Sequence, residues 1–141
     1  MDIFEELHNE HEEVSKLIAQ LEEGGRDDET FETLRTELTA HAKAEEQVFY
    51  KRLEGEESVR DTVLEGCEEH KVVVRVLSDM AQTSADDEKF MAKLAVLKES
   101  VEHHVEEEEG TIFEGARPLL ADGEAVELYE EFEAEKSKLE G

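Results

Sequence analysis

The chain is poor in the residues that interrupt helices or cross-link loops. Its 141 residues include one proline, one cysteine and no tryptophan. The single cysteine, Cys67, excludes an internal disulfide and agrees with a reducing, cytoplasmic compartment. We expect a small buried residue at this position, with a redox or ligand role left open. Period-two alternation of apolar residues is also absent, which argues against β-strands.

Positively charged residues are few compared with negatively charged ones. Lys and Arg number 15 against 41 Asp and Glu, which gives a formal net charge of −26. Because nucleic acids and anionic membranes are bound through basic side chains, this balance argues against both as partners. No leader-like N-terminus or membrane-spanning apolar run is visible, so we expect a soluble cytoplasmic protein. The acidic excess fits either a saline cytoplasm or ordinary solvated helix faces.

Helical periodicity and a few breakers divide the chain into five expected helices, over about residues 2–23, 29–53, 58–82, 88–116 and 123–139. Gly24 and Gly25 end the first helix, Ser58 is the expected N-cap of the third, and Pro118 follows the fourth. A polar link over 83–87 precedes the fourth helix. These features predict an all-α fold: one domain over 1–141, with an antiparallel up-down-up-down four-helix bundle over about 2–117 and a short additional C-terminal helix.

Each of the four long segments carries an apolar stripe at helical spacing, and ionisable residues interrupt every stripe. Burying such groups without partners would cost several kcal/mol, so something must neutralise them. A purely structural, hydrogen-bonded role would require partners for all of them at once. The interrupting residues are His11, His41, Glu45, His70, His104 and Glu108.

The second and fourth segments repeat one ligand pattern, His41-Ala-Lys-Ala-Glu45-Glu46 and His104-Val-Glu-Glu-Glu108-Glu109. Residues four apart lie one turn above another, so each histidine and its glutamate can approach one metal ion from the same side. The second stripe is expected to continue at Val48. Two hairpins, each with two imidazoles and one carboxylate, fit two metal ions bridged by both glutamates. Mixed ligation of this kind favours iron and also accepts manganese or zinc.

These motifs resemble the hemerythrin-like, or HHE cation-binding, domain family over about residues 3–120. The resemblance is carried by Leu7-His8-Asn9-Glu10-His11, by Glu69-His70, and by the repeated His-x-x-x-Glu-Glu with Phe49-Tyr50 or Ile112-Phe113 after it. It implies a non-haem di-iron centre in a four-helix bundle that binds dioxygen, or senses oxygen, iron or nitric oxide. The ligands that it implies are His11, His41, Glu45, His70, His104 and Glu108.

The third helix departs from the family pattern. Oxygen-carrying hemerythrins have two histidines four residues apart there, whereas His70 stands alone, with Gly66 and Val74 one turn away. One iron position would then be open, filled by water, or taken by His8 or another carboxylate. The resemblance to oxygen carriers therefore does not include their fifth histidine.

The fourth helix allows a second ligand register, since oxygen carriers use a spacing of five there. His103 with Glu108, or His104 with Glu109, would satisfy that spacing. We prefer His104 with Glu108 because this pair repeats the second helix and lies on the apolar stripe. Outside the six ligands we expect His8 and His103 at the rim, Glu46, Glu107 and Glu109 in solvent, and Tyr50 and Phe113 packed beside the site.

The sequence thus predicts a di-iron binding protein for dioxygen or nitric oxide that serves storage, delivery or sensing. One alternative is a di-iron enzyme that reduces peroxide, nitric oxide or dioxygen with electrons from a donor. Another is a bundle in which the metal, such as zinc, only holds helices together. Any protein partner is expected to act in trans.

Overall fold

The computed structural model describes residues 1–84 and 86–140, so Ala85 of the predicted link 83–87 lies outside the described residues. All regular structure within these ranges is helical, which confirms the predicted all-helical bundle. The long helices are α1 (Ile3–Gly24), α2 (Asp28–Glu45), α4 (Arg60–Ala81), α5 (Lys89–Glu107) and α7 (Glu124–Glu140). Within the described ranges, no helix is both long and apolar enough to cross a membrane.

The helix ends follow local chemistry in most places. The Asp2 side chain accepts a hydrogen bond from the backbone N–H of Glu5, and the Glu5 side chain accepts one from the N–H of Asp2, so a capping box starts α1. Gly25 ends α1 with a φ of +74°, a conformation that favours glycine. The prediction for the third helix was wrong by one residue, because Val59 rather than Ser58 is its N-cap and supplies no side-chain hydrogen bond.

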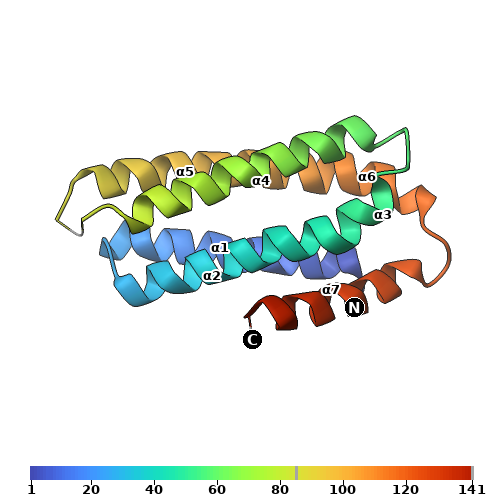
Figure 1. Ribbon diagram of the computed structural model, residues 1–141, viewed down its shortest axis with the longest axis horizontal. Coiled ribbons are helices and arrows are strands. Elements are labelled where there is room, and N and C mark those ends of the chain that lie inside the picture. The colour runs from blue at the N-terminus through green and yellow to red at the C-terminus, as the bar shows by residue number, and fades with distance from the viewer. Residues whose placement is uncertain (85, 141) are drawn as a thin grey trace.

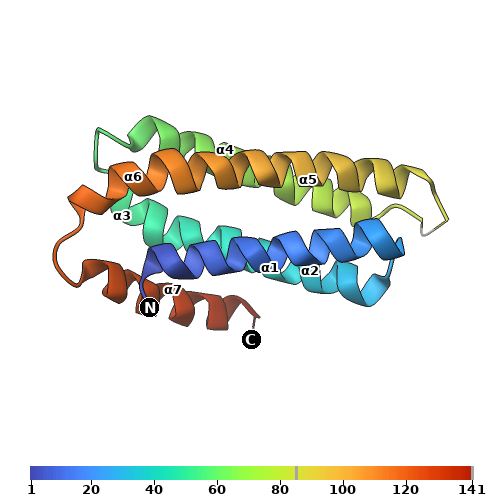
Figure 2. The same cartoon turned by 180° about the vertical axis from the view of Figure 1, so that it is seen from behind.

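Two helical hairpins build the bundle (Figures 1 and 2). The first hairpin consists of α1 and α2, the second of α4 and α5, and the chain reverses direction at each successive long helix. Helix α7 packs along α1 and α2, on the side of the first hairpin that faces away from the second. The second hairpin is therefore left uncovered by α7.

Both second helices of the hairpins contain a π-helical turn beside the repeated glutamate. The turn η1 (Glu46–Tyr50) joins α2 to α3 (Lys51–Leu53), and η2 (Glu108–Ile112) joins α5 to α6 (Phe113–Ala116), before the 3-10 turn η3 (Arg117–Leu119). A π turn inserts an extra residue and rotates the helix beyond it. As a result Phe49 and Tyr50 are buried, whereas Val48 is only half-buried, so the predicted continuation of the stripe at Val48 was wrong.

The hydrophobic core consists of two clusters. One lies toward the start of α1 and contains the aromatic side chains Phe4, Phe49, Tyr50 and Phe113. The other lies toward the α1–α2 and α4–α5 turns and is mostly aliphatic, with Leu, Val, Ile and Met side chains and two phenylalanines. The buried polar residues between the two clusters are His11, His41, Glu45, His70, His104 and Glu108.

Candidate metal centre

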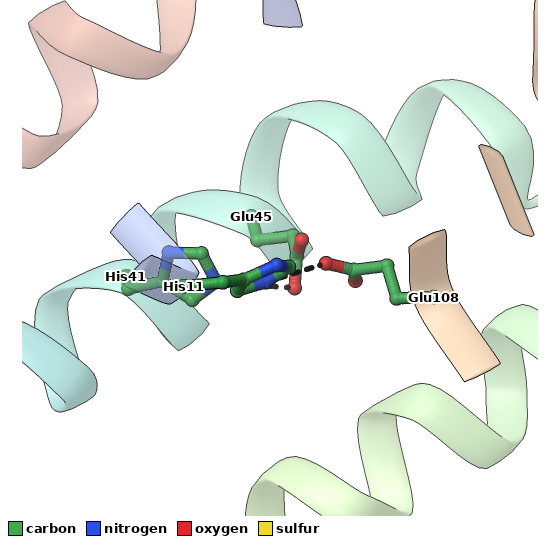
Figure 3. Close-up of side chains that lie close together, drawn as sticks. All are labelled: His11, His41, Glu45 and Glu108. Atoms are coloured by element: carbon green, nitrogen blue, oxygen red, sulfur yellow. Dashed lines mark ion pairs between the residues drawn. The ribbon is translucent and has the colours of Figure 1, made fainter. Parts of the chain in front are cut away.

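The structure brings all six predicted ligand residues into one buried layer of the bundle. Each is at most 8% exposed, and Glu45 and Glu108 are fully buried. Figure 3 shows His11, His41, Glu45 and Glu108 pointing toward one another from α1, α2 and the start of η2. Four chain segments that lie far apart in the sequence therefore contribute to a single cluster.

The layer divides into two overlapping sets of four side chains. Within each set, one nitrogen or oxygen atom of every residue lies within 4.8 Å of one from each of the others. Glu45 and Glu108 belong to both sets, whereas each histidine belongs to one. The first set is His11, His41, Glu45 and Glu108, and the second is Glu45, His70, His104 and Glu108. This is the shared-carboxylate arrangement predicted for two ions.

A ring of outer glutamates fixes the orientation of the imidazoles. His11 Nδ1 lies 2.6 Å from Glu109, and His41 Nδ1 lies 2.7 Å from Glu10. In the second hairpin, the corresponding distances are 2.6 Å from His70 Nδ1 to Glu46 and 2.7 Å from His104 Nδ1 to Glu69. Carboxylates in this position hold metal-binding histidines in the tautomer whose inner nitrogen is free.

The inner Nε2 atoms lack ordinary partners. His11 and His41 have no hydrogen bond at Nε2, although His11 Nε2 lies 3.0 Å from Glu108 Oε1. The Nε2 atoms of His70 and His104 lie 3.1 Å apart. When Nδ1–H donates to an outer glutamate, each neutral ring presents a lone pair at Nε2, and two facing lone pairs need a cation between them.

The two shared carboxylates also lack hydrogen-bond partners. Both oxygens of Glu45 and Oε1 of Glu108 are buried without a hydrogen-bond donor. Buried anions are normally paired or bound to a metal ion. Burial raises the pKa of Glu108, but the nearby imidazoles of His104 and His11, when they carry a proton, outweigh burial and hold this pKa well below its usual value. The layer therefore presents anionic oxygens and imidazole nitrogens, a donor set that fits iron, manganese or zinc.

Protons are the alternative cations for this layer. Burial lowers the pKa of His11, but the carboxylates of Glu108 and Glu109 beside its ring outweigh burial and raise it to about 10. By the same balance, carboxylates raise the pKa of His70 to about 9 and that of His104 to about 11. Because a metal ion binds the unprotonated ring, loading would release these protons.

Tyr50 fills the space beside Gly66, one of the two positions one turn from His70 where a further histidine could lie. Its ring stacks on His70, with centroids 5.5 Å apart and an interplanar angle of 7°, and its hydroxyl donates a hydrogen bond to Glu108. Of the two positions one turn from His70, Val74 is exposed and Gly66 is buried. A Cβ atom on Gly66 would lie 2.7 Å from the Tyr50 hydroxyl oxygen. The space beside Gly66 is thus already filled by tyrosine.

The remaining sequence candidates lie outside the inner layer. His8 Nδ1 lies 2.9 Å from Glu109, so His8 contacts the carboxylate that holds His11. His103 is exposed and contacts Glu69 at 3.2 Å. Burial and nearby glutamates raise the pKa of the half-buried Cys67 thiol to about 11, which disfavours the reactive thiolate.

Sequence reasoning missed the outer carboxylates. Glu46 and Glu109 were expected in solvent, but each accepts from a ligand imidazole. Glu10 and Glu69 were part of the resembling motifs without a stated role. A usable signal existed, because a glutamate directly adjoins a predicted ligand in every one of the four motifs. The adjoining pairs are Glu10-His11, Glu45-Glu46, Glu69-His70 and Glu108-Glu109.

The fold and this layer together define a helical-bundle protein with a buried histidine–carboxylate centre for metal cations. Comparison with known families agrees with that class. The family model described as hemerythrin HHE cation binding domain matches residues 2–116, and the chain belongs to this family. The matched region contains all six candidate ligands and ends before α7.

One curated relative is a DNA nickase from Nostoc sp. (strain PCC 7120 / SAG 25.82 / UTEX 2576), which is 30% identical over 143 aligned residues. The alignment covers 99% of this chain but only 40% of that protein. The chain thus spans less than half the length of the relative. No solved structure matches the chain.

Proposed function

We propose that this protein binds two iron ions at the buried layer and uses them to bind dioxygen or nitric oxide for storage, delivery or sensing. One observation carries the proposal. Two sets of two inward-facing imidazoles share the carboxylates Glu45 and Glu108. Within these sets, Nε2 of His11 and His41, both oxygens of Glu45 and Oε1 of Glu108 are buried without the hydrogen bonds that would satisfy a metal-free layer. Manganese or zinc is the less favoured occupant, because mixed imidazole and carboxylate ligation suits iron.

The chain's own residues perform distinct tasks in this proposal. Glu45 and Glu108 would hold both ions, and each histidine would bind one ion through Nε2 while its Nδ1–H donates to an outer glutamate. Bound iron supplies open coordination positions and reversible oxidation. The Tyr50 hydroxyl donates to Glu108, and this donation restricts the rotation of a shared carboxylate.

The space beside the layer supports a small ligand. A small cavity of about 20 Å³ adjoins all four histidines and is otherwise lined by hydrophobic side chains. A cavity of this volume has room for about one water-sized molecule. Its non-histidine lining is Val14, Leu38, Ala42, Val73, Val101 and Val105. A diatomic molecule is of this size.

The proposal also includes the predicted order of the helices, the cytoplasmic location and the absence of nucleic-acid and membrane partners. The up-down-up-down order of α1, α2, α4 and α5 is supported by the two hairpins in Figure 1. The lone cysteine supports a cytoplasmic location. The net charge of −26 opposes direct binding to nucleic acid or anionic membranes. The curated relative is named a DNA nickase, but the alignment covers only 40% of its length. DNA cleavage is therefore not part of the proposal.

The deciding experiment measures metal content per chain in protein purified without added metal, and then records absorption spectra of the reduced protein before and after exposure to air. We expect about two irons per chain, from the two ligand sets, and an oxygen-dependent charge-transfer band. Glu45→Ala and Glu108→Ala should each abolish loading of the second ion. The exposed Glu65→Ala is the matched control and should load normally.

Three results would contradict parts of the proposal. Retention of both irons by Glu45→Ala and Glu108→Ala would refute the ligand assignment. Irreversible oxidation with turnover of peroxide, nitric oxide or dioxygen would favour the enzyme alternative, which requires an electron donor. One zinc ion without redox change would favour the structural alternative.

A further inference from the structure

Helix α7 reaches the metal layer from outside the family-matched region. It follows the matched residues 2–116 and packs on α1 and α2. Arg52 anchors its first turn through a contact with Glu124 at 2.5 Å, and it also holds the preceding turn η3 through the Leu119 carbonyl oxygen at 3.1 Å. Leu128 and Phe132 are its buried residues, with Phe132 fully buried. The helix is thus fixed at its start and packed along its middle.

Two side chains of α7 act on His41. The Phe132 ring meets the His41 ring edge to face, with centroids 6.1 Å apart. Lys136 Nζ lies 2.5 Å from Glu10 Oε2, and Glu10 Oε1 lies 2.7 Å from His41 Nδ1. A chain of polar contacts therefore runs from Lys136 through Glu10 to His41.

The four outer glutamates differ in this respect. Of the lysines and arginines within residues 1–84 and 86–140, Lys136 alone lies within ion-pair distance of an outer glutamate. Its partner is Glu10. The Glu10 side chain is 13% exposed, compared with 25% for Glu69, 27% for Glu109 and 38% for Glu46. The outer carboxylate of His41 is thus the most shielded of the four, and α7 provides the shield.

The surroundings of Glu10 explain why the lysine matters. Glu6 and Glu133 lie with Glu10 in one acidic group, and Glu37 and Glu140 lie 3.5 Å and 3.9 Å from Lys136. Without the lysine, Glu10 would face four other carboxylates and would gain by turning toward solvent. His41 would then lose the partner that holds its ring and its tautomer.

We propose that Lys136 is a positioning residue that couples the docking of α7 to metal binding at the His11–His41 half of the centre. The inference rests on the proposed function, since it assumes that the layer binds metal. The His70–His104 half has its own outer glutamates, Glu46 and Glu69, and neither pairs with α7. The two halves therefore differ in their dependence on α7.

The test uses the full chain and ferrous ion as the probe, under anaerobic conditions. Lys136→Met removes the charge and keeps the length of the side chain. Lys138→Met is the matched control, because Lys138 lies on the same helix, is 76% exposed and pairs with Glu135 of that helix. Lys136→Arg tests rescue by a second cation. Stepwise binding constants for the two ions are measured for each variant by calorimetry.

We expect Lys136→Met to weaken one of the two ferrous binding constants by about tenfold, the lower end of the effect of losing an outer partner, and to leave the other within about twofold. Lys138→Met should match the wild type, and Lys136→Arg should restore most of the loss. Unchanged constants in Lys136→Met, or an equal loss in both, would overturn the inference. Failure of the wild type to bind ferrous ion would instead refute the proposed function.

A second readout does not depend on reactivity. Because coupling between two events is reciprocal, metal binding should stabilise the docked α7 by the same factor by which docking strengthens metal binding. A protease that cleaves after glutamate has many sites in α7. We expect ferrous ion to slow cleavage within α7 in the wild type and in Lys138→Met, but much less in Lys136→Met. Equal protection in all three proteins would overturn the coupling.

Discussion

At the scale of single residues, the outer glutamates decide what the histidines can bind. A neutral imidazole donates from one nitrogen and accepts at the other, and Glu10, Glu46, Glu69 and Glu109 select the tautomer with the lone pair inside. The same histidines without these partners would be free to rotate or to exchange tautomers. Metal binding by the inner six residues should therefore depend on the outer four.

Replacement of one outer carboxylate tests this dependence. Glu69→Gln keeps the size of the side chain but removes the anion that accepts from His104 Nδ1. We expect a loss of about 10- to 100-fold in affinity for ferrous ion, measured by anaerobic titration. Glu65→Gln, at an exposed position one turn away on the same helix, is the control and should bind like the wild type. Equal affinities for all three proteins would show that the outer carboxylates are dispensable.

Gly66 gives a prediction about packing. Gly66→Ala would place a Cβ atom 2.7 Å from the Tyr50 hydroxyl oxygen, so the tyrosine must shift and its hydrogen bond to Glu108 must weaken. We expect a loss of about 1–3 kcal/mol in the free energy of unfolding by urea, typical of overpacking. Adding Tyr50→Phe should recover part of this loss, because the closest atom is removed. Gly24→Ala, with open space around it, is the control.

At the scale of helices, the π turns place the two ligand pairs. Each π turn begins at or just after the repeated glutamate. Aromatic residues at the end of η1 (Phe49 and Tyr50) and directly after η2 (Phe113) pack in the core. The extra residue in each turn lets the helix satisfy two registers, one for the His-x-x-x-Glu pair and one for the hydrophobic cluster above it. Glu108 is consequently fully buried, whereas Glu109 lies outside the layer and accepts from His11.

The packing of α7 on α1 carries a pH dependence. Burial and the neighbouring Glu133 raise the pKa of Glu6 from 4.5 to about 7, with Glu10 adding to the shift and Lys136 opposing it. The folded state thus holds this proton more tightly than the unfolded state, so stability decreases as the pH rises from 4.5 to about 7. Above that range Glu6 and Glu133 are both charged and repel each other.

Glu133→Gln should therefore stabilise the metal-free protein near neutral and basic pH and do much less in mild acid. We expect a gain below about 1 kcal/mol, because the pair is partly exposed. Urea unfolding at pH values below and above the Glu6 pKa measures this gain in stability. Glu130→Gln, at an exposed position of α7, should not show this pH-dependent difference. A Glu133→Gln gain that is equal at acidic and basic pH would contradict the assigned cause.

Much of this architecture was predictable from local patterns. Helical spacing located the long helices and the six inner residues, because burial of one helix face imposes a period of 3.6 residues. The π turns escaped prediction, since an inserted residue breaks that period, and Val48 was misplaced for this reason. The roles of Glu10 and Lys136 also escaped it, because contacts between α1, α2 and α7 depend on tertiary packing rather than on spacing.

At the scale of the whole molecule, charge dominates. The formal net charge of −26 is spread over 141 residues, and like charges on a compact surface repel. Added salt should therefore stabilise the fold, because the screening length falls from about 10 Å at 0.1 M to about 3 Å at 1 M. The urea midpoint measures this effect, since urea carries no charge. Sodium and potassium chloride should act alike, and a midpoint that falls with either salt would contradict the explanation.

The two hydrophobic clusters also determine how electrons can reach the centre. Along the bundle axis, the polar layer has aromatic side chains on one side and aliphatic ones on the other. Across the bundle, by contrast, each imidazole leads through one carboxylate toward the surface. A redox partner would thus find its shortest polar route at the flanks of the bundle rather than at its ends. On a surface this acidic, the electron donor of the enzyme alternative would need a basic docking face.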